Sequence, residues 1–237
     1  MIIRMDTRGT HSEPLNKRAI AFIDGQNLFH ALKKAFGRTY PDYEIKTLTK
    51  KICDLYDWKL EQIRFYTGVH DYSENPYWHN FWALKIARMR RQGIWTYTRL
   101  LRYQEKEIKI TDEKGLSQIY KTKTSVEKGI DVRIAIDILR LTLKQKFEIA
   151  LIFSQDQDLR EVADEIKEIA VEQSRWIRMT CAFPDNSGKK YNRGIDNTTW
   201  IKFDQQLYER CIDPFDYKSH IEKMRGQLML PIDWYSS

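Results

Sequence analysis

The sequence has few of the residues that build disulfide frameworks, zinc sites and flexible linkers. Its 237 residues include only three cysteines, 10 glycines and six prolines. The cysteines at positions 53, 181 and 211 are far apart and have no paired spacing, which argues against a disulfide framework and against a zinc site. We therefore expect a reducing, cytoplasmic location. We also expect a compact globular domain, since no low-complexity segment interrupts the chain.

Long apolar runs and several common catalytic motifs are lacking as well. No stretch of 18 apolar residues occurs and residues 1–16 are polar, so we expect no membrane segment and no signal peptide, but a flexible tail. The five histidines show no metal-ligand spacing. A Gly-rich phosphate loop and a Ser-His-Asp arrangement are also missing, which argues against P-loop enzymes and serine hydrolases.

Basic residues outnumber acidic ones, 40 to 33, giving a net charge of +7 and a pI near 9.1. This excess is compatible with a polyanionic partner but does not require one. The candidate nucleic-acid contacts are Arg88, Arg90, Arg91, Lys128, Lys189, Lys190 and Arg193. The first three stand at the end of a predicted helix, where the helix dipole alone explains them, and that simpler interpretation is favoured.

Apolar patterns along the chain alternate between strand-like and helix-like periods. Short buried strands are predicted at 19–23, 63–69, 94–101, 149–153, 177–183 and 200–203, with helices between most of them. This order is typical of an α/β domain with a mainly parallel central sheet. We place that domain at residues 17–204 and expect residues 205–237 to form an extension that packs back on it.

An irregular segment at 103–124 is predicted to form a hairpin inserted into this framework. Between residues 99 and 128, eight basic residues stand against five acidic ones, and Tyr103 and Tyr120 lie among them. Aromatic and basic side chains together are what single-stranded nucleic acid binds. A solvated hairpin explains the pattern equally well.

Acidic residues follow two of the predicted strands at the point where each strand ends. Asp24 comes directly after residues 19–23, while Asp156 and Asp158 come just after residues 149–153. In parallel sheets the carboxyl ends of the strands are where binding sites lie. The same residues could instead cap the helices that begin there, so position alone does not decide between capping and chemistry.

A further helix is predicted to open at residues 127–131. Glu127 and Asp131 are four residues apart and would share one face of that helix, and Asp131 would border its buried stripe. A carboxylate there needs a cation or hydrogen bonds. Asp137 lies about 120° further round the helix. We interpret it as structural, either paired with a basic side chain or solvated.

The three acidic positions would meet at one edge of the sheet. Asp24, Asp131 and Asp156 would then repel one another unless a cation neutralised them. Carboxylates without histidine or cysteine favour Mg²⁺ or Mn²⁺. Such an ion activates water and stabilises charge on a phosphate, so metal-assisted hydrolysis of a phosphodiester is the chemistry that this pattern predicts.

Three motifs strengthen this interpretation through a resemblance. Residues 22–27 (FIDGQN), 128–132 (KGIDV) and 154–159 (SQDQDL) resemble, in order, the motifs of NYN domains, which are PIN-like nucleases of the LabA type. The resemblance covers roughly residues 18–203. It implies a PIN-like, Rossmann-like three-layer sandwich and a metal-dependent ribonuclease acting on RNA, with DNA and a homo-oligomer left open.

The resemblance also implies roles for individual residues. Asp24, Asp131 and Asp156 would hold the metal, Asp158 would stand beside them, and Asn27 would orient Asp24 or its turn. Gln155 and Leu159 depart from the Gly and Phe that the family often has, but neither belongs to the acidic set. Asp196 is a weaker candidate.

Two alternatives to a nuclease remain. A binding or regulatory module could keep the fold and bind RNA or a protein without cutting, although the acids are intact. A phosphatase or nucleotide-binding protein is disfavoured, because the first predicted strand lacks an Asp-x-Asp pattern and a Gly-rich fingerprint.

Overall fold

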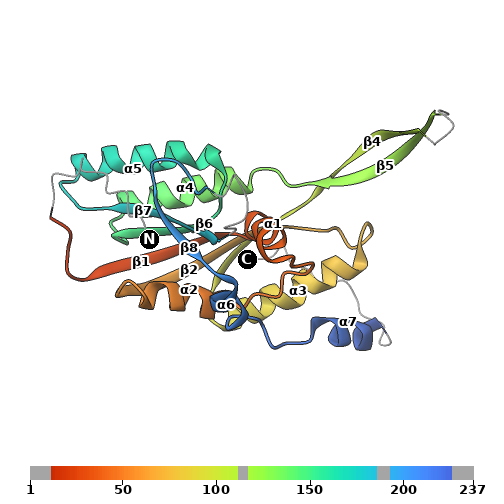
Figure 1. The fold of residues 1–237 in the computed structure, drawn as a ribbon, viewed down its shortest axis with the longest axis horizontal. Coiled ribbons are helices and arrows are strands. Elements are labelled where there is room, and N and C mark those ends of the chain that lie inside the picture. The colour runs from red at the N-terminus through yellow and green to blue at the C-terminus, as the bar shows by residue number, and fades with distance from the viewer. Residues whose placement is uncertain (1–11, 112–116, 186–192, 226–237) are drawn as a thin grey trace.

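A six-stranded, all-parallel sheet forms the centre of the protein (Figure 1). The computed structural model describes residues 12–111, 117–185 and 193–225. The strand order is β3-β2-β1-β6-β7-β8. The strands are β1 (Lys17–Asp24), β2 (Trp58–Val69), β3 (Trp95–Leu100), β6 (Ile149–Phe153), β7 (Arg178–Pro184) and β8 (Thr199–Phe203).

Helices connect or follow these strands, and several of them begin at a side chain that caps the helix. They are α1 (Gly25–Phe36), α2 (Ile45–Asp54), α3 (Pro76–Arg91), α4 (Ile130–Leu143), α5 (Arg160–Glu172), α6 (Gln205–Glu209) and α7 (Tyr217–Arg225). Asp24 caps α1, and Asn75 caps α3 by accepting a hydrogen bond from the backbone N of Trp78 at 3.2 Å. Gly37 ends α1 with φ at 68°, as its place after the apolar period predicts.

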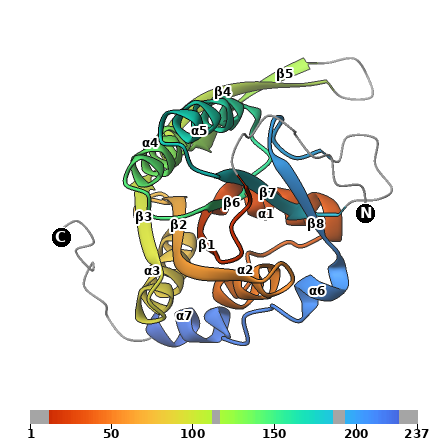
Figure 2. The same cartoon turned by 90° about the vertical axis from the view of Figure 1, so that its left-hand side faces the viewer.

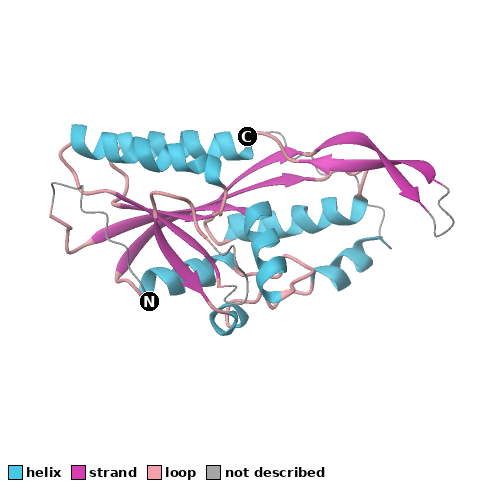
Figure 3. Ribbon diagram, turned by 45° about the horizontal axis from the view of Figure 1, so that its top comes forward, coloured by secondary structure: helices cyan, strands magenta, loops and turns pink. Residues whose placement is uncertain are grey.

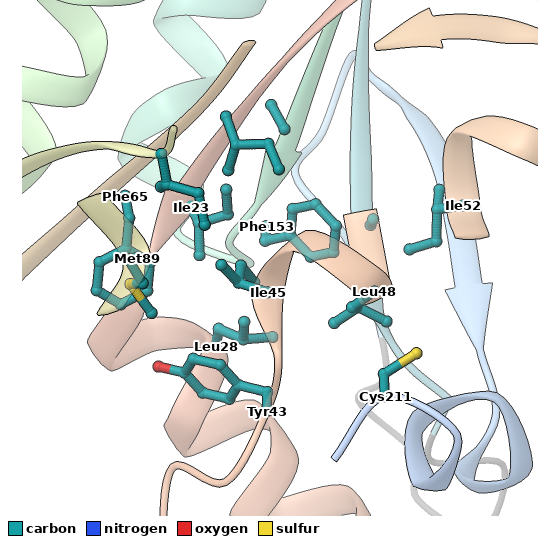
Figure 4. Close-up of a cluster of buried hydrophobic side chains, with 14 of the residues drawn as sticks. Ile23, Leu28, Tyr43, Ile45, Leu48, Ile52, Phe65, Met89, Phe153 and Cys211 are labelled. Atoms are coloured by element: carbon teal, nitrogen blue, oxygen red, sulfur yellow. The ribbon is translucent and has the colours of Figure 1, made fainter. Parts of the chain in front are cut away.

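Both faces of the sheet are covered, which confirms the predicted three-layer α/β architecture. One apolar core lies between the sheet and helices α1, α2 and α3; Figure 4 shows part of it. A second core lies between the opposite face and helices α4 and α5. Figure 2 shows the two helical layers on either side of the strands. Every residue of β6 is buried, as its unbroken apolar run predicts for a strand covered on both faces.

The order of the strands reverses between β1 and β6, which pair in parallel at the centre of the sheet. From β1 the chain moves outward through β2 to β3, and from β6 it moves the other way through β7 to β8. At such a switch point the two outgoing loops separate and leave room beyond the carboxyl edge. Asp24 ends β1 at this point, and Asp156 follows β6 by three residues.

The predicted hairpin is present and projects beyond the sheet as a two-stranded arm (Figures 1 and 3). It consists of β4 (Arg102–Thr111) and β5 (Ser117–Val126), slightly longer than the 103–124 segment. The prediction that a helix opens at Glu127 is wrong, because α4 begins at Ile130. Gly129 precedes α4 with φ at 76°, a left-handed conformation that separates Glu127 from the helix.

The described part of the chain after β8 packs against α3. Asp213 accepts a hydrogen bond from the Lys85 Nζ at 3.3 Å, and the Tyr217 ring stands 4.9 Å from that of Phe81 in an edge-to-face arrangement. Lys85 is only 1% exposed, and burial lowers its pKa to about 8 even though Asp213 acts in the opposite sense. In the described ranges no helix is both long and apolar enough to cross a membrane.

Candidate active site

Asp24 occupies the end of β1 at the centre of the carboxyl edge. Its side chain is 6% exposed, and its Oδ1 accepts a hydrogen bond from the backbone N of Asn27 at 3.0 Å. Burial, together with the charges of Asp156 and Asp131, raises the pKa of Asp24 to about 6. Asp24 therefore both caps α1 and lies within electrostatic reach of the two other predicted metal ligands.

Asn27 connects the two halves of this edge. Its backbone N donates to Asp24, while its side-chain Oδ1 accepts a hydrogen bond from the backbone N of Gln155 at 2.9 Å. The residue thus ties the turn after β1 to the segment after β6. This geometry supports an orienting role for Asn27 and extends it, because the link reaches the segment that carries Asp156.

Asp156 combines a capping role with a place among the acids. Its Oδ1 accepts a hydrogen bond from the backbone N of Asp158 at 3.1 Å, at the start of the 3-10 turn Gln157–Leu159. Its own backbone N donates to the Ser154 Oγ at 3.2 Å. The Asp158 side chain is exposed, and the contact that joins it to Asp156 uses its backbone. The role of the Asp158 carboxylate beside the metal ligands therefore stays a prediction.

Glu127 is a member of this site that the sequence analysis did not select. Its Oε2 accepts a hydrogen bond from the backbone N of Gly68 at the end of β2. Burial, together with the charges of Asp24 and Asp131, raises the pKa of Glu127 to about 8. A Cβ on Gly68 would lie 2.7 Å from Glu127 Oε2, so the absence of a side chain at Gly68 makes room for the carboxylate.

Asp131 lies in the first turn of α4 and is partly buried. It acts electrostatically on both Asp24 and Glu127, although the helical face that it was predicted to share with Glu127 does not exist. Asp131 therefore belongs to the site because the first turn of α4 brings it within electrostatic reach of Asp24 and Glu127. We call Asp24, Glu127, Asp131 and Asp156 the carboxylate cluster.

The carboxylate cluster fits a hard divalent cation by its donor chemistry. Asp24 is buried and Glu127 is partly buried, and their charges repel one another. No Lys or Arg in the described ranges forms an ion pair with any of the four acids. All its donors are oxygens, as Mg²⁺ and Mn²⁺ prefer. However, the side chains as they are placed do not form a complete metal site. Among the described residues, no group of three His, Cys, Asp or Glu side chains is close enough together to bind one metal ion.

A comparison with protein-family models gives a match over the central part of the chain. The family model described as NYN domain matches residues 18–173, which include β1, β2, β3 and β6 and all four members of the carboxylate cluster. The chain belongs to the NYN domain family. NYN domains are PIN-like nucleases, which makes nucleic acid the expected class of substrate.

Other comparisons add little to this assignment. A search of curated proteins finds no significant match. Among solved structures, a protein of unknown function from Vibrio parahaemolyticus is similar over 87% of this chain and 98% of its own, with 14% identity and a TM-score of 0.41. Ribokinase from Giardia lamblia is similar over 76% of this chain and 51% of its own, with 12% identity and a TM-score of 0.32.

The basic residues selected from the sequence lie at different places in the NYN domain. Lys128 is exposed and directly follows Glu127, and Arg193 is held beside the segment after β6, where its backbone O accepts a hydrogen bond from the Gln155 Nε2 at 2.7 Å. Lys189 and Lys190 lie outside the described residues. Gln155, where the family often has Gly, thus anchors the loop that precedes β8.

The arginines at the end of α3 have structural contacts. Arg88 lies 3.8 Å from Asp213 and stacks over the ring of Phe215 at 4.1 Å, so it helps to hold the segment after α6. Arg90 donates to the Thr96 Oγ1 at 2.7 Å, and Arg91 is exposed. These contacts favour the structural interpretation for Arg88.

Two further acids have partners of their own. Asp137 is buried and pairs with Arg64 at 2.9 Å and Arg133 at 3.0 Å, which confirms the structural role expected for it. Asp196 forms an exposed ion pair with Arg193 at 3.6 Å, and its backbone N donates to the Gln157 Oε1. The position of Asp196 is therefore that of a loop anchor beside the site.

Proposed function

We propose that this NYN domain is a divalent-metal-dependent ribonuclease that hydrolyses RNA phosphodiester bonds at the carboxylate cluster. The observation that supports it most is the gathering of acids without a described cationic partner at the switch point of the sheet. Burying mutually repelling carboxylates costs free energy that a purely structural role would not require. Membership of a nuclease family supplies the class of reaction.

In this proposal the members of the carboxylate cluster bind Mg²⁺ or Mn²⁺, and Asn27 positions two of them. The metal supplies activated water and stabilises the negative charge that develops on the phosphate. The hydrogen bond from Asn27 N fixes the Asp24 carboxylate, while the bond between Asn27 Oδ1 and Gln155 N fixes the segment leading to Asp156. Gly68 N holds the Glu127 carboxylate against the end of β2.

The second candidate is a module that keeps the fold and binds RNA or a protein without cleaving. It gains support from the observation that the described His, Cys, Asp and Glu side chains form no group of three able to hold a metal as they stand. Metal binding separates the two candidates. Calorimetric titration with Mn²⁺ should show binding to the ribonuclease and none to the non-catalytic module.

The proposal is tested with labelled single-stranded RNA incubated with the protein and Mg²⁺ or Mn²⁺. Asp24→Asn should lower the rate of cleavage by at least about 100-fold, since the loss of outer partners alone lowers the activity of metal sites by roughly 10- to 100-fold. Asparagine caps helices as well as aspartate does, so the cap of α1 should survive and the variant should stay folded. Full activity of folded Asp24→Asn would refute the assignment.

Asp158→Asn provides a comparison at a nearby position. It removes the same charge two residues from Asp156, but its side chain is exposed, and the described contact between the two residues uses the backbone N of Asp158. We expect its activity to stay within roughly a few-fold of the original, consistent with the small effect of most surface substitutions. An equal loss in Asp156→Asn and Asp158→Asn would return Asp158 to the catalytic set that the sequence predicts.

A further inference from the structure

The two faces of the hairpin formed by β4 and β5 differ in charge: one carries acidic and basic side chains, and the other carries basic ones without acids among its described residues. Side chains alternate along a strand, and directly opposed residues share a face. By this register, one face carries Tyr103, Glu105 and Glu107 opposite Ser125, Lys123 and Lys121. The other, which we call the basic face, carries Arg102, Gln104 and Lys106 opposite Val126, Thr124 and Thr122. Among the described side chains, both acids of the hairpin lie on the first face.

The first face is attached to the body of the protein. The Tyr103 hydroxyl lies 3.0 Å from the His70 Nδ1, and Lys123 pairs with Glu74 while lying 5.2 Å over the Tyr103 ring. These contacts fix the root of the hairpin to the loop between β2 and α3. They also give the hydroxyl and the ring of Tyr103 partners within the protein. The basic face is on the opposite side of the hairpin from this attachment.

The cations of the basic face are free to meet a ligand. Arg102 and Lys106 are exposed, and neither forms an ion pair or side-chain hydrogen bond with the described residues. Four residues of a strand separate them by about 13 Å. Their neighbours Gln104, Thr122 and Thr124 are polar and uncharged, and such side chains commonly contact phosphate oxygens.

Two further exposed cations connect the basic face to the carboxylate cluster. Arg99, near the end of β3, donates from Nη1 to the backbone O of Lys128 at 3.3 Å. Its guanidinium lies against Gly129, whose left-handed φ of 76° favours glycine at that position. Because Lys128 directly follows Glu127, the exposed cations begin beside the cluster and continue outward along the arm.

We propose that the basic face, together with Arg99 and Lys128, binds the phosphodiester backbone of a nucleic acid that extends outward from the carboxylate cluster. The choice of RNA as the ligand rests on the function proposed above. Contacts to phosphates fix the position of a strand without reading its sequence. A surface for another protein would be expected to have an apolar, aromatic-rich centre. The described side chains of the basic face are mainly cations, amides and hydroxyls, with Val126 at the root and the exposed Ile108 further out as its apolar members.

The test measures binding of a fluorescent single-stranded RNA to the full chain carrying Asp24→Asn, by anisotropy at several salt concentrations. A double variant, Arg102→Gln with Lys106→Gln, removes two charges from the basic face. Its matched control, Lys121→Gln with Lys59→Gln, also removes two exposed charges. In the control, Lys121 comes from the first face of the hairpin and Lys59 from the start of β2, where it pairs with Glu61 at 2.8 Å.

The salt dependence gives the expected size of the effect. For single strands the slope of log K against log salt is about −0.7 for each phosphate contact, so two lost contacts reduce its magnitude by about 1.4. The loss of affinity between 50 and 200 mM salt should then be about sevenfold smaller for the basic-face variant than for its parent, following the same slope. The control variant should keep the slope of its parent, and all three proteins should unfold at the same temperature.

An unchanged slope in the basic-face variant, or the same change in both double variants, would overturn the proposal. So would a chain that binds no RNA, or a variant that loses only self-association in size-exclusion chromatography, which would make the arm a contact between copies. A single-stranded DNA of the same sequence distinguishes backbone binding in general from RNA binding.

The outcomes separate this inference from the proposed function. If the chain binds RNA through the basic face but never cleaves it, the proposed function fails and this inference stands. If the chain cleaves RNA and binds it independently of the basic face, only this inference fails.

Discussion

Replacing Glu127 by glutamine should change how the stability of the protein depends on pH. Burial, aided by Asp24 and Asp131, raises the pKa of Glu127 from 4.5 to about 8. Between these values the folded chain holds a proton on Glu127 that the unfolded chain has lost. The folded state therefore binds more protons, and the free energy of unfolding falls as the pH rises from about 4.5 to about 8.

The size of this effect follows from the same values. The difference between 4.5 and about 8, at about 1.36 kcal/mol per pH unit, corresponds to roughly 5 kcal/mol as an upper limit. Residual solvent contact of Glu127 lowers this, so we expect a difference of about 2 to 4 kcal/mol. Glutamine has the same shape, can still accept the hydrogen bond from Gly68 N, and does not ionise. The pKa of Asp24, raised to about 6, leaves a smaller dependence in both proteins.

The measurement is urea denaturation at pH 5, 6, 7 and 8 in the presence of a chelator. The original protein should lose stability steadily over this range, while Glu127→Gln should lose less and become the more stable of the two at pH 8. Added Mg²⁺ or Mn²⁺ should restore more stability to the original protein than to the variant, because a ligand that binds only the folded state stabilises it. Glu161→Gln, at an exposed position on α5, is the control and should follow the original protein. Parallel curves for the original protein and Glu127→Gln would refute the assignment of Glu127 to the carboxylate cluster.

Two other substitutions test the supports of the site. Asp137→Ala should lower the free energy of unfolding by about 3 to 5 kcal/mol in urea denaturation, because it leaves the buried Arg64 without its ion-pair partner; a loss below about 1 kcal/mol, the range of exposed ion pairs, would contradict this. Asn27→Ala should cost about 1 to 2 kcal/mol by removing the acceptor for Gln155 N, and should slow RNA cleavage by roughly 10- to 100-fold, as the loss of an orienting partner does. Cleavage at the original rate in a folded Asn27→Ala variant would show that the link does not position the acids.

The sheet and two of the acids could be predicted because their signals are local. The run Ile149–Phe153 reads as a strand buried on both faces, and that strand is β6 at the centre of the sheet. Asp24 follows from the same logic, since it comes directly after an apolar run and must therefore lie at the carboxyl edge. Hydrophobic period and strand ends are properties of neighbouring residues, which the sequence displays directly.

The place of Glu127 in the site depends on the backbone conformation of one residue, Gly129. An apolar period extended back through Gly129 predicts Glu127 on a helix, on one face with Asp131, and does not predict its contact with the end of β2. Gly129 instead takes a left-handed φ before the helix begins. A glycine directly ahead of an apolar period was the available signal, since glycine favours the ends of helices over their interiors.

Partners that are distant in sequence could not be predicted at all. Arg88 read as a candidate phosphate contact, yet its partners Asp213 and Phe215 lie more than 120 residues further along the chain. The sequence around Tyr103 is compatible with base stacking and with a solvated hairpin alike, and it gives no sign of the contact between the Tyr103 hydroxyl and His70. Local patterns carry no information on such pairs, because the pairs arise only when the chain folds back on itself.

The buried Lys85 determines how much of the chain must fold as a unit. The family match ends at residue 173, yet the partners of Lys85 include Asp213, together with the backbone O of Tyr43 at 2.9 Å. Tyr43 in turn directs its hydroxyl toward the backbone O of Gly25, beside Asp24. A protein cut after β8 would strand an ammonium group in an apolar setting next to the turn that carries the first acid. The segment around Asp213 is thus a structural part of the unit that carries the carboxylate cluster, although it lies beyond the residues matched by the family model.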